Sequence, residues 1–358
     1  MTATHAETVA VGSAINRVLA GDVLTRAETA EAFLAILEAA FEGADVAWGA
    51  LLGALHARGP TLGEVRGLVD AVLRFDPELA DQLAAPIDLG VEARVVAIAG
   101  SGKETFKTFN VSTAAAFVAA AHPDVCVVKP AGRATSAVTG ASDLLAELDV
   151  RPARALGDLA EVARGSGVCV FDYHLVAPRY GPRYEGRFHH LHPLSYVTPW
   201  MFVPIQTDGV VFGVADSRVE LTASVMALSG VERAAVVSTA MPPWGRIDEL
   251  APFGKAELAI VCRGAVERQT FVAPVPSDLS SIAQRPTSQA NAELFLDVLS
   301  GRAPKLALEL VQENAAVVLH VAGVVDDLDS GRATARALLA SGAALAQLDV
   351  CRQASQEM

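Results

Sequence analysis

The chain of 358 residues carries a formal net charge of −13, and 52% of its residues are hydrophobic, 19% charged and 6% aromatic. This length suffices for two domains, or for one large α/β body with a helical appendage. The acidic balance argues against a general nucleic-acid surface, and no apolar run reaches the ~18 residues that a membrane-spanning helix needs. The first residues lack the basic and apolar regions of a secretory signal, so we expect a cytoplasmic protein with no nucleic-acid or membrane partner.

The first 77 residues predict a helical module. Thr25 with Glu28, and Thr61 with Glu64, have the spacing of capping boxes, and each pair precedes a periodic apolar run. Gly59 follows one of these runs and is typical of a helix end. We therefore expect about four helices in this module.

From residue 94 onward, short β-branched runs alternate with alanine-rich stretches. This alternation predicts βαβ units and a mainly parallel sheet. We expect a loop over residues 178–193 and three closing helices, the last of which runs through residues 333–348. The expected strands cover residues 95–99, 125–129, 168–172, 210–216, 234–238, 257–263 and 269–274.

The predicted fold class is therefore α/β, with a small helical N-terminal domain and a larger α/β domain around a mainly parallel central sheet. We expect the helical domain to span residues 1–90 and to be completed by residues 175–207. The α/β domain is expected to comprise residues 91–174 and 208–358.

Two loops rich in small residues, at residues 100–104 and 129–140, each lead toward a helix and predict a phosphate site. Glycines let the backbone approach a ligand, and free amides at a helix start point toward anionic oxygens. Lys129 and Arg133 add positive charge there. The segment GSGKE is no P-loop, because Ala97 stands at the leading glycine position and Glu104 replaces the Ser or Thr that binds Mg²⁺.

The longer pattern is more specific. GSGKETFKTFNVST and KPAGRATSAVTGASDLL keep the spacing of GTGGD, TFNxST and KHGNRxxSxxSGxxDxL, and in these motifs the chain resembles the anthranilate phosphoribosyltransferases. That family belongs to the nucleoside phosphorylase/phosphoribosyltransferase class. The resemblance extends to GADVAWGALLGALHARGPTLGEV near the N-terminus and ANAELFLDVLSG near the C-terminus. It implies phosphoribosyl pyrophosphate (PRPP) as the donor, Mg²⁺ as the cofactor and a homodimer formed through the N-terminal helices.

Carried over residue by residue, the resemblance implies where the donor and the metal bind. Ser112, Asp248 and Glu249 would hold Mg²⁺, which binds through few protein ligands and keeps waters. Metal and cations would stabilise the charge that develops on the departing pyrophosphate. No general base is evident, so no residue is assigned as catalytic. The implied donor-binding residues are Gly100, Ser101, Gly102, Lys103, Glu104, Thr108, Asn110, Ser112, Thr113, Lys129, Arg133 and Ser136.

The chain departs from the family where the acceptor binds. The family's His-Gly-Asn is replaced by Pro130, Ala131 and Gly132, and its stretch resembling LGIRTIFNLLGPLTNP, whose arginine recognises the anthranilate carboxylate, is replaced by SYVTPWMFVPIQTDG. The implied activity is therefore that of a pentosyltransferase moving ribose 5-phosphate to a small aromatic acceptor other than anthranilate. Lys103 adds a cation near the donor or forms an ion pair with Glu104.

The segment APRYGPRYEGRFHH, with the residues that follow it, is a hypothetical new acceptor pocket. Its aromatic rings could stack on a planar acceptor, and one arginine could pair with an acid. The alternative is a solvent loop with ordinary surface arginines. A zinc site is disfavoured because no fourth ligand lies at a suitable spacing from the three histidines. The candidate acceptor residues are Arg179, Arg183, Arg187, His192 and Trp200.

Two other classes of function stay open. Gly132-Arg133 with Thr139-Gly140 and Asp143 echoes the third loop of pyrimidine nucleoside phosphorylases, although GSGKE differs from their KHSTGG-like first loop. A non-catalytic relative that binds a ligand or a partner, including the nucleic-acid-binding branch of the family, is the other alternative. The acidic balance opposes nucleic acid, and the retained acidic pair opposes loss of catalysis.

Overall fold

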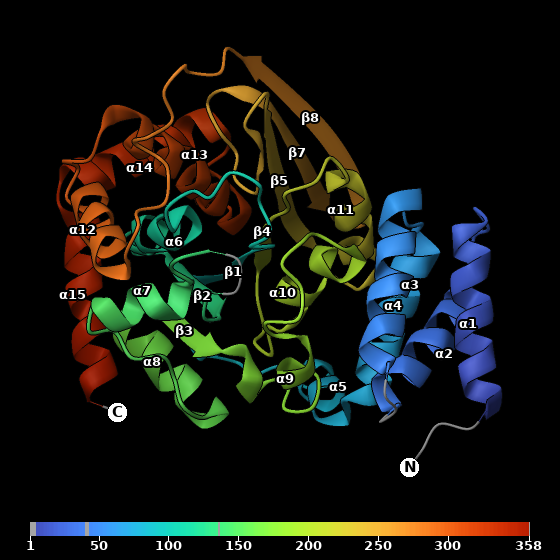
Figure 1. The fold of residues 1–358 in the computed structure, drawn as a ribbon. Helices are drawn as coiled ribbons and strands as arrows, with labels where there is room; N and C mark the ends of the chain where they lie inside the picture. Colours follow the sequence, from blue (N-terminus) through green and yellow to red (C-terminus); the bar gives the residue numbers. More distant parts are fainter. Residues whose placement is uncertain (1–4, 40–42, 135–136, 358) are drawn as a thin grey trace.

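A helical part lies beside a larger α/β part in the structure, a computed structural model that describes residues 5–39, 43–134 and 137–357 (Figure 1). The helical part begins with α1 (His5–Leu19), α2 (Arg26–Glu38), α3 (Ala44–Arg58), α4 (Leu62–Phe75) and α5 (Pro77–Ala84). Both predicted capping boxes are present, at the starts of α2 and α4. The carboxylate of Glu64 is fully buried and also accepts a hydrogen bond from the Leu24 amide at 2.9 Å, so this cap ties α4 to the turn before α2.

The centre of the α/β part is one sheet, which contains eight strands within the described residues. Their order is β3-β2-β1-β4-β5-β7-β8, with β6 paired to β5. The first five strands of this order pair in parallel, whereas β7 and β8 run antiparallel to their neighbours. The strands are β1 (Arg94–Gly100), β2 (Val125–Ala131), β3 (Val168–Asp172), β4 (Gly209–Gly213), β5 (Arg233–Met241), β6 (Gly245–Ile247), β7 (Gly254–Cys262) and β8 (Ala265–Ala273).

This strand order creates a switch point between β1 and β4. From β1 the chain adds β2 and then β3 on one side, and β4 and β5 follow on the other side. In open α/β sheets, ligands bind outside the carboxyl ends of the strands at such a point. The loops after β1, β2 and β4 therefore face one crevice.

The two faces of the sheet have separate apolar cores. One core contains α6 (Val111–Ala120) and the closing helices, and the other contains α8 (Leu159–Ser166), α11 (Val219–Leu228) and the helical part. Figure 1 accordingly shows α12–α15 on the opposite side of the sheet from α1–α4. The remaining helices of the α/β part are α7 (Ala141–Glu147), α12 (Ser288–Leu299), α13 (Lys305–Ala322), α14 (Leu328–Ala340) and α15 (Ala343–Gln356).

The predicted last helix is two helices in the structure. Residues 333–348 are divided at Gly342, whose φ of +78° is a left-handed backbone conformation that favours glycine. Four helices rather than three therefore close the described chain. None of the described helices is long and apolar enough to cross a bilayer.

Residues 173–202 lie between the two parts and pack on the helical one. The segment contains α9 (Gly181–Tyr184), α10 (Thr198–Met201) and the short 3₁₀ turns η2 (Tyr173–Leu175) and η3 (Pro193–Tyr196). The indole of Trp48 on α3 stacks with Tyr180 at 6.4 Å between ring centroids and lies 5.6 Å from Phe188. These contacts are those expected if the segment completes the helical domain, whose exact boundaries stay a prediction.

Candidate active site

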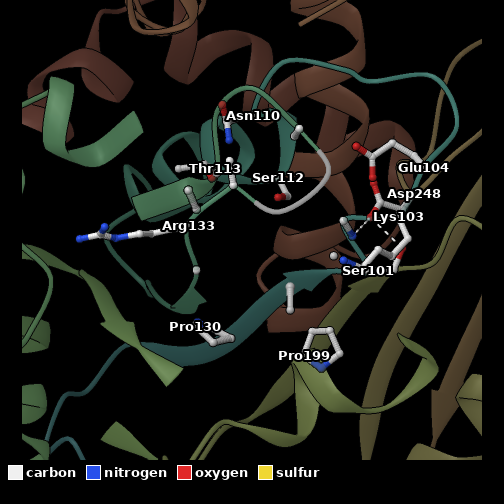
Figure 2. Close-up of a pocket in the computed structure, with 18 of the residues that line it drawn as sticks. Ser101, Lys103, Glu104, Asn110, Ser112, Thr113, Pro130, Arg133, Pro199 and Asp248 are labelled. Carbon is white, nitrogen blue, oxygen red and sulfur yellow. Dashed lines mark hydrogen bonds between the residues drawn. The ribbon is translucent and has the colours of Figure 1, made fainter. Parts of the chain in front are cut away.

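A pocket opens at the carboxyl ends of β1 and β2, beside the switch point of the sheet. It is lined by the loops after β1 and β2, the start of α6, the acidic residues that follow β6, and part of the segment 173–202. Figure 2 shows these groups converging from separate elements. Of the predicted donor and metal residues, the structure brings all but Ser136 to this pocket, and Ser136 lies outside the described residues.

The loop after β1 is held by Asp248. Its carboxylate accepts hydrogen bonds from the Ser101 hydroxyl at 3.1 Å and from the Gly102 amide at 3.0 Å. The strand ends are glycines because Asp248 lies against both of them. A Cβ at Gly213 would lie 1.8 Å from the Asp248 carbonyl oxygen, and one at Gly100 would lie 2.8 Å from its carboxylate.

Three carboxylates gather at one end of the pocket. Glu249 is buried and accepts a hydrogen bond from the Thr108 hydroxyl at 2.8 Å through Oε1, while its Oε2 has no hydrogen-bond partner among the described residues. Burial, with the nearby charges of Asp248 and Glu104, raises the pKa of Glu249 well above its usual value. Burial and Asp248 also raise the pKa of Glu104, whose carboxylate pairs with Lys107 at 3.3 Å.

This acidic end fits a divalent cation bound through few protein ligands. An unpartnered buried carboxylate oxygen and mutual repulsion between acids are both relieved by a cation. Within the described residues, however, no group of three or more His, Cys, Asp or Glu side chains is arranged as a complete metal site. Mg²⁺ does not require one, because it keeps several waters and binds through one or two carboxylates plus substrate phosphates.

Two lysines supply positive charge beside these acids. Lys129 on β2 is buried and donates to the Ser112 hydroxyl at 3.1 Å, at the start of α6. Burial lowers the pKa of Lys129 to about 8, against the opposing effect of Asp248 and Glu249. Burial, with Lys107 nearby, also lowers the pKa of Lys103 to about 8. The Glu104 carboxylate pairs with Lys107, and Lys103 lines the pocket.

The other predicted donor residues lie along the rim near α6. The Asn110 amide donates to the Thr139 carbonyl at 3.3 Å, which links the α6 start to the loop after β2. Thr113 is buried in the first turn of α6. Arg133 is exposed, and Figure 2 shows its side chain extending away from Pro130 and Pro199.

The opposite end of the pocket is aromatic. Tyr173 and Phe202 line it and stack on each other, with ring centroids 5.3 Å apart and planes 12° from parallel. Tyr184, Phe188 and Glu185 also line the pocket, and the side chain of Glu185 lies next to the Tyr173 phenol. Burial and the Glu185 charge raise the pKa of the Tyr173 phenol. Sequence reasoning missed Tyr173 and Glu185, although Tyr173 directly follows β3 and so stands where a parallel sheet presents its carboxyl ends.

The arginine hypothesis for the acceptor pocket is corrected by the structure. None of the three arginines is among the described residues that line the pocket. Arg179 lies over the Phe75 ring at 4.6 Å, Arg183 lies 5.8 Å from the Trp48 ring, and Arg187 pairs with Asp45 at 2.6 Å. Aromatic rings and an acid of the helical part bind these guanidinium groups, so they fix the segment to that part.

His192 and Trp200 are also displaced from the predicted role. Trp200 donates from Nε1 to the Tyr196 carbonyl at 2.9 Å and lines a different hollow. His192 is fully buried behind the aromatic wall, 4.5 Å from Phe188 between ring centroids, and burial lowers its pKa well below the usual value. It supports the wall and does not line the pocket.

Comparisons with known proteins decide the family. The model of the glycosyl transferase family α/β domain matches residues 92–345, and that of the glycosyl transferase family helical bundle domain matches residues 12–75. An anthranilate phosphoribosyltransferase of Anaeromyxobacter dehalogenans is 33% identical over 354 residues, which are 94% of this chain and 96% of the relative. The chain belongs to the anthranilate phosphoribosyltransferase family. This membership makes it a pentosyltransferase, as the sequence predicted.

Other anthranilate phosphoribosyltransferases are similar to this chain over nearly its whole length. The enzyme of Shewanella loihica is 29% identical over 355 residues, 95% of this chain and 96% of the relative. The crystal structure of the Thermus thermophilus enzyme matches with a TM-score of 0.76 at 24% identity, over 96% of this chain and 99% of that chain. The structure of the Saccharomyces cerevisiae enzyme in complex with PRPP and Mg matches with a TM-score of 0.76 at 19% identity. The match covers 98% of this chain and 99% of that chain. These two likenesses confirm the predicted fold.

Proposed function

We propose that the protein is a Mg²⁺-dependent phosphoribosyltransferase that moves ribose 5-phosphate from PRPP to a small planar acceptor other than anthranilate. The observation that carries the proposal is the division of one pocket into two ends. One end has glycine backbone, lysines and a carboxylate cluster, and the other end is aromatic.

The first end suits a donor rich in phosphate. The glycines at positions 100 and 102 let the backbone of this loop approach a bound donor. Buried Lys129 lies beside the start of α6, where free amides also favour anions. Ser112, Asp248 and Glu249 would hold Mg²⁺, which supplies charge neutralisation for pyrophosphate when bound. In this assignment, the carboxylates repel one another and gain stability from the cation.

Transfer breaks the bond between C1 of the ribose and a pyrophosphate oxygen and forms one between C1 and the acceptor nucleophile, which releases a proton. No described side chain has the position of an evident general base. The contribution of this chain is then to orient donor and acceptor in line and to place cations where pyrophosphate charge develops.

The acceptor proposal follows from the second end. The arginines of the segment 173–202 are bound elsewhere, and Pro130 and Gly132 line the pocket where relatives of this family carry other residues. Among the described lining residues, no arginine of the segment 173–202 is present to pair with the carboxylate of anthranilate.

The test measures donor binding and transfer separately. We expect PRPP with Mg²⁺ to raise the melting temperature by several degrees, and pyrophosphate to be released when a suitable acceptor is added. Asp248→Asn should abolish both effects, whereas the exposed matched control Asp81→Asn should keep them. Absence of any PRPP-dependent stabilisation in the wild type would contradict the proposal, and so would arsenolysis of nucleosides without PRPP.

We also propose a homodimer formed through the N-terminal helices. Val9 and Leu19 of α1 and Val46 of α3 are among the exposed large apolar side chains of the molecule, with exposed fractions of 57%, 67% and 75%. Exposed apolar residues on these N-terminal helices favour burial against a second copy.

A further inference from the structure

The aromatic end of the pocket carries an acid where recognition of anthranilate would need a cation. Glu185 follows α9, and its side chain is 23% exposed. Its Oε2 lies 2.9 Å from Nε2 of His174, whose Nδ1 lies 3.2 Å from the Asp172 carboxylate. The two nitrogens of one imidazole therefore each lie beside a carboxylate.

The second carboxylate oxygen faces the loop that departs most from the family. A Cβ at Gly132 would lie 3.6 Å from Oε1 of Glu185 and 3.1 Å from Cε1 of Tyr173. Any side chain at position 132 would thus fill the space in front of this oxygen. Glycine leaves this space unfilled, beside the stacked rings of Tyr173 and Phe202, and the Tyr173 phenol is itself a hydrogen-bond neighbour of Glu185.

The cations of the pocket come from elements other than the segment 173–202. Among the described lining residues these are Lys103 in the loop after β1, Lys129 on β2 and Arg133 in the loop after β2. The first two lie in the donor elements described above, and Arg133 is exposed at the rim. An acceptor ring that packs beside Tyr173 and Phe202 would lie next to the Glu185 carboxylate.

From this juxtaposition, we propose that the acceptor is a planar aromatic or heteroaromatic amine that lacks a carboxylate and donates an N–H group to Glu185. An amide, an amidine or a ring N–H can supply this donor, and a bond to a carboxylate is stronger than one between neutral groups. A carboxylic acid at the same place would face like charge. The inference rests on the proposed function and names the chemical class of its acceptor.

Three ligands with the same ring test the proposal: 2-aminobenzamidine, 2-aminobenzamide and 2-aminobenzoate. Their affinities are measured by calorimetry with Mg²⁺ and pyrophosphate present, so that no transfer occurs. We expect the amide and the amidine to bind the wild type at least tenfold more tightly than the acid. Glu185→Gln should reduce this ratio to threefold or less, because the amide group removes the charge and keeps the shape.

Two further variants complete the test. Gly132→Asn should weaken binding of the amide and the amidine by tenfold or more, because its side chain fills the space before Glu185. The exposed Glu220→Gln serves as the matched control and should keep the wild-type ratio. The PRPP-dependent rise in melting temperature, measured on every variant, reports on the donor end and thus on the proposed function separately.

The proposal is overturned if the acid binds as tightly as the amide, if Glu185→Gln leaves the ratio unchanged, or if none of the three ligands binds at millimolar concentration. With PRPP stabilisation intact, any of these results refutes the acceptor class alone. Loss of PRPP stabilisation in the wild type instead refutes the proposed function.

Discussion

The contact between Gly213 and Asp248 gives a sharp test of how the fold places the acidic end of the pocket. Gly213 ends β4, and a Cβ built there would lie 1.8 Å from the Asp248 carbonyl oxygen. Ordinary van der Waals contacts begin at 3.4 Å, so Gly213→Ala requires the two backbones to separate by about 3.4 − 1.8 = 1.6 Å. A flexible side chain cannot absorb this shift, because the obstructing atom belongs to the backbone.

The expected consequence is large for function and moderate for stability. Overpacking by one methyl group costs about 1–3 kcal/mol of the free energy of unfolding. A misplacement of about 1 Å in a catalytic group can reduce the rate by about 100-fold. Because Asp248 also accepts hydrogen bonds from Ser101 and Gly102, the loop after β1 would move with it.

The assay compares Gly213→Ala with Gly157→Ala, where an added Cβ meets nothing within 4 Å. Thermal melting with and without PRPP and Mg²⁺ gives stability and donor binding, and pyrophosphate release gives kcat/KM. We expect Gly157→Ala to behave as the wild type, and Gly213→Ala to lose about 100-fold in kcat/KM while it still folds. Wild-type kcat/KM in Gly213→Ala would refute the argument that this contact positions the acidic pair.

Four further outcomes follow from the contacts described above. Glu249→Gln should raise the free energy of unfolding in metal-free buffer, because it removes a buried carboxylate whose ionisation burial opposes, and should abolish Mg²⁺-dependent PRPP binding. Burial lowers the pKa of His192 well below its usual value of 6.5, so the unfolded chain binds this proton more readily and stability should fall as the pH drops from 6.5 to about 5. The measurement is the difference in pH slope between the wild type and His192→Leu. Arg183→Ala should cost about 1 kcal/mol in denaturant unfolding through loss of its packing on Trp48, and an unchanged acceptor KM would distinguish this role from acceptor binding. Val46→Lys should shift the mass measured by light scattering from dimer toward monomer, and a monomeric wild type would contradict the proposed homodimer.

The donor end of the pocket was predictable from sequence because it consists of short motifs at fixed positions on a βαβ unit. GSGKE begins at the end of β1, Asn110 immediately precedes α6, and Lys129 lies near the end of β2. Parallel strands bring their carboxyl ends together at one edge of the sheet. Asp248 is far away in sequence, and only the resemblance linked it to these loops. The structure places its carboxylate 3.0 Å from the Gly102 amide.

The acceptor end was not predictable in the same way. Arginine and aromatic residues in residues 178–193 are equally compatible with a pocket and with packing on another part of the chain. The partners that decide between them, Phe75, Trp48 and Asp45, lie more than a hundred positions earlier. The sequence predicted one helix over residues 333–348 because its alanine-rich composition favours helix on both sides of Gly342. The turn at this glycine was therefore not predicted.

The packing of residues 173–202 against α3 has a consequence for the order of events during synthesis. Trp48 is nearly fully buried in the complete chain, against Tyr180 and Phe188. These partners are made more than a hundred residues later, and at typical rates of translation this interval is on the order of ten seconds. During that time the newly made N-terminal helices present an uncovered apolar surface to the cell. The nascent chain is therefore expected to depend on chaperones until about residue 207 has left the ribosome.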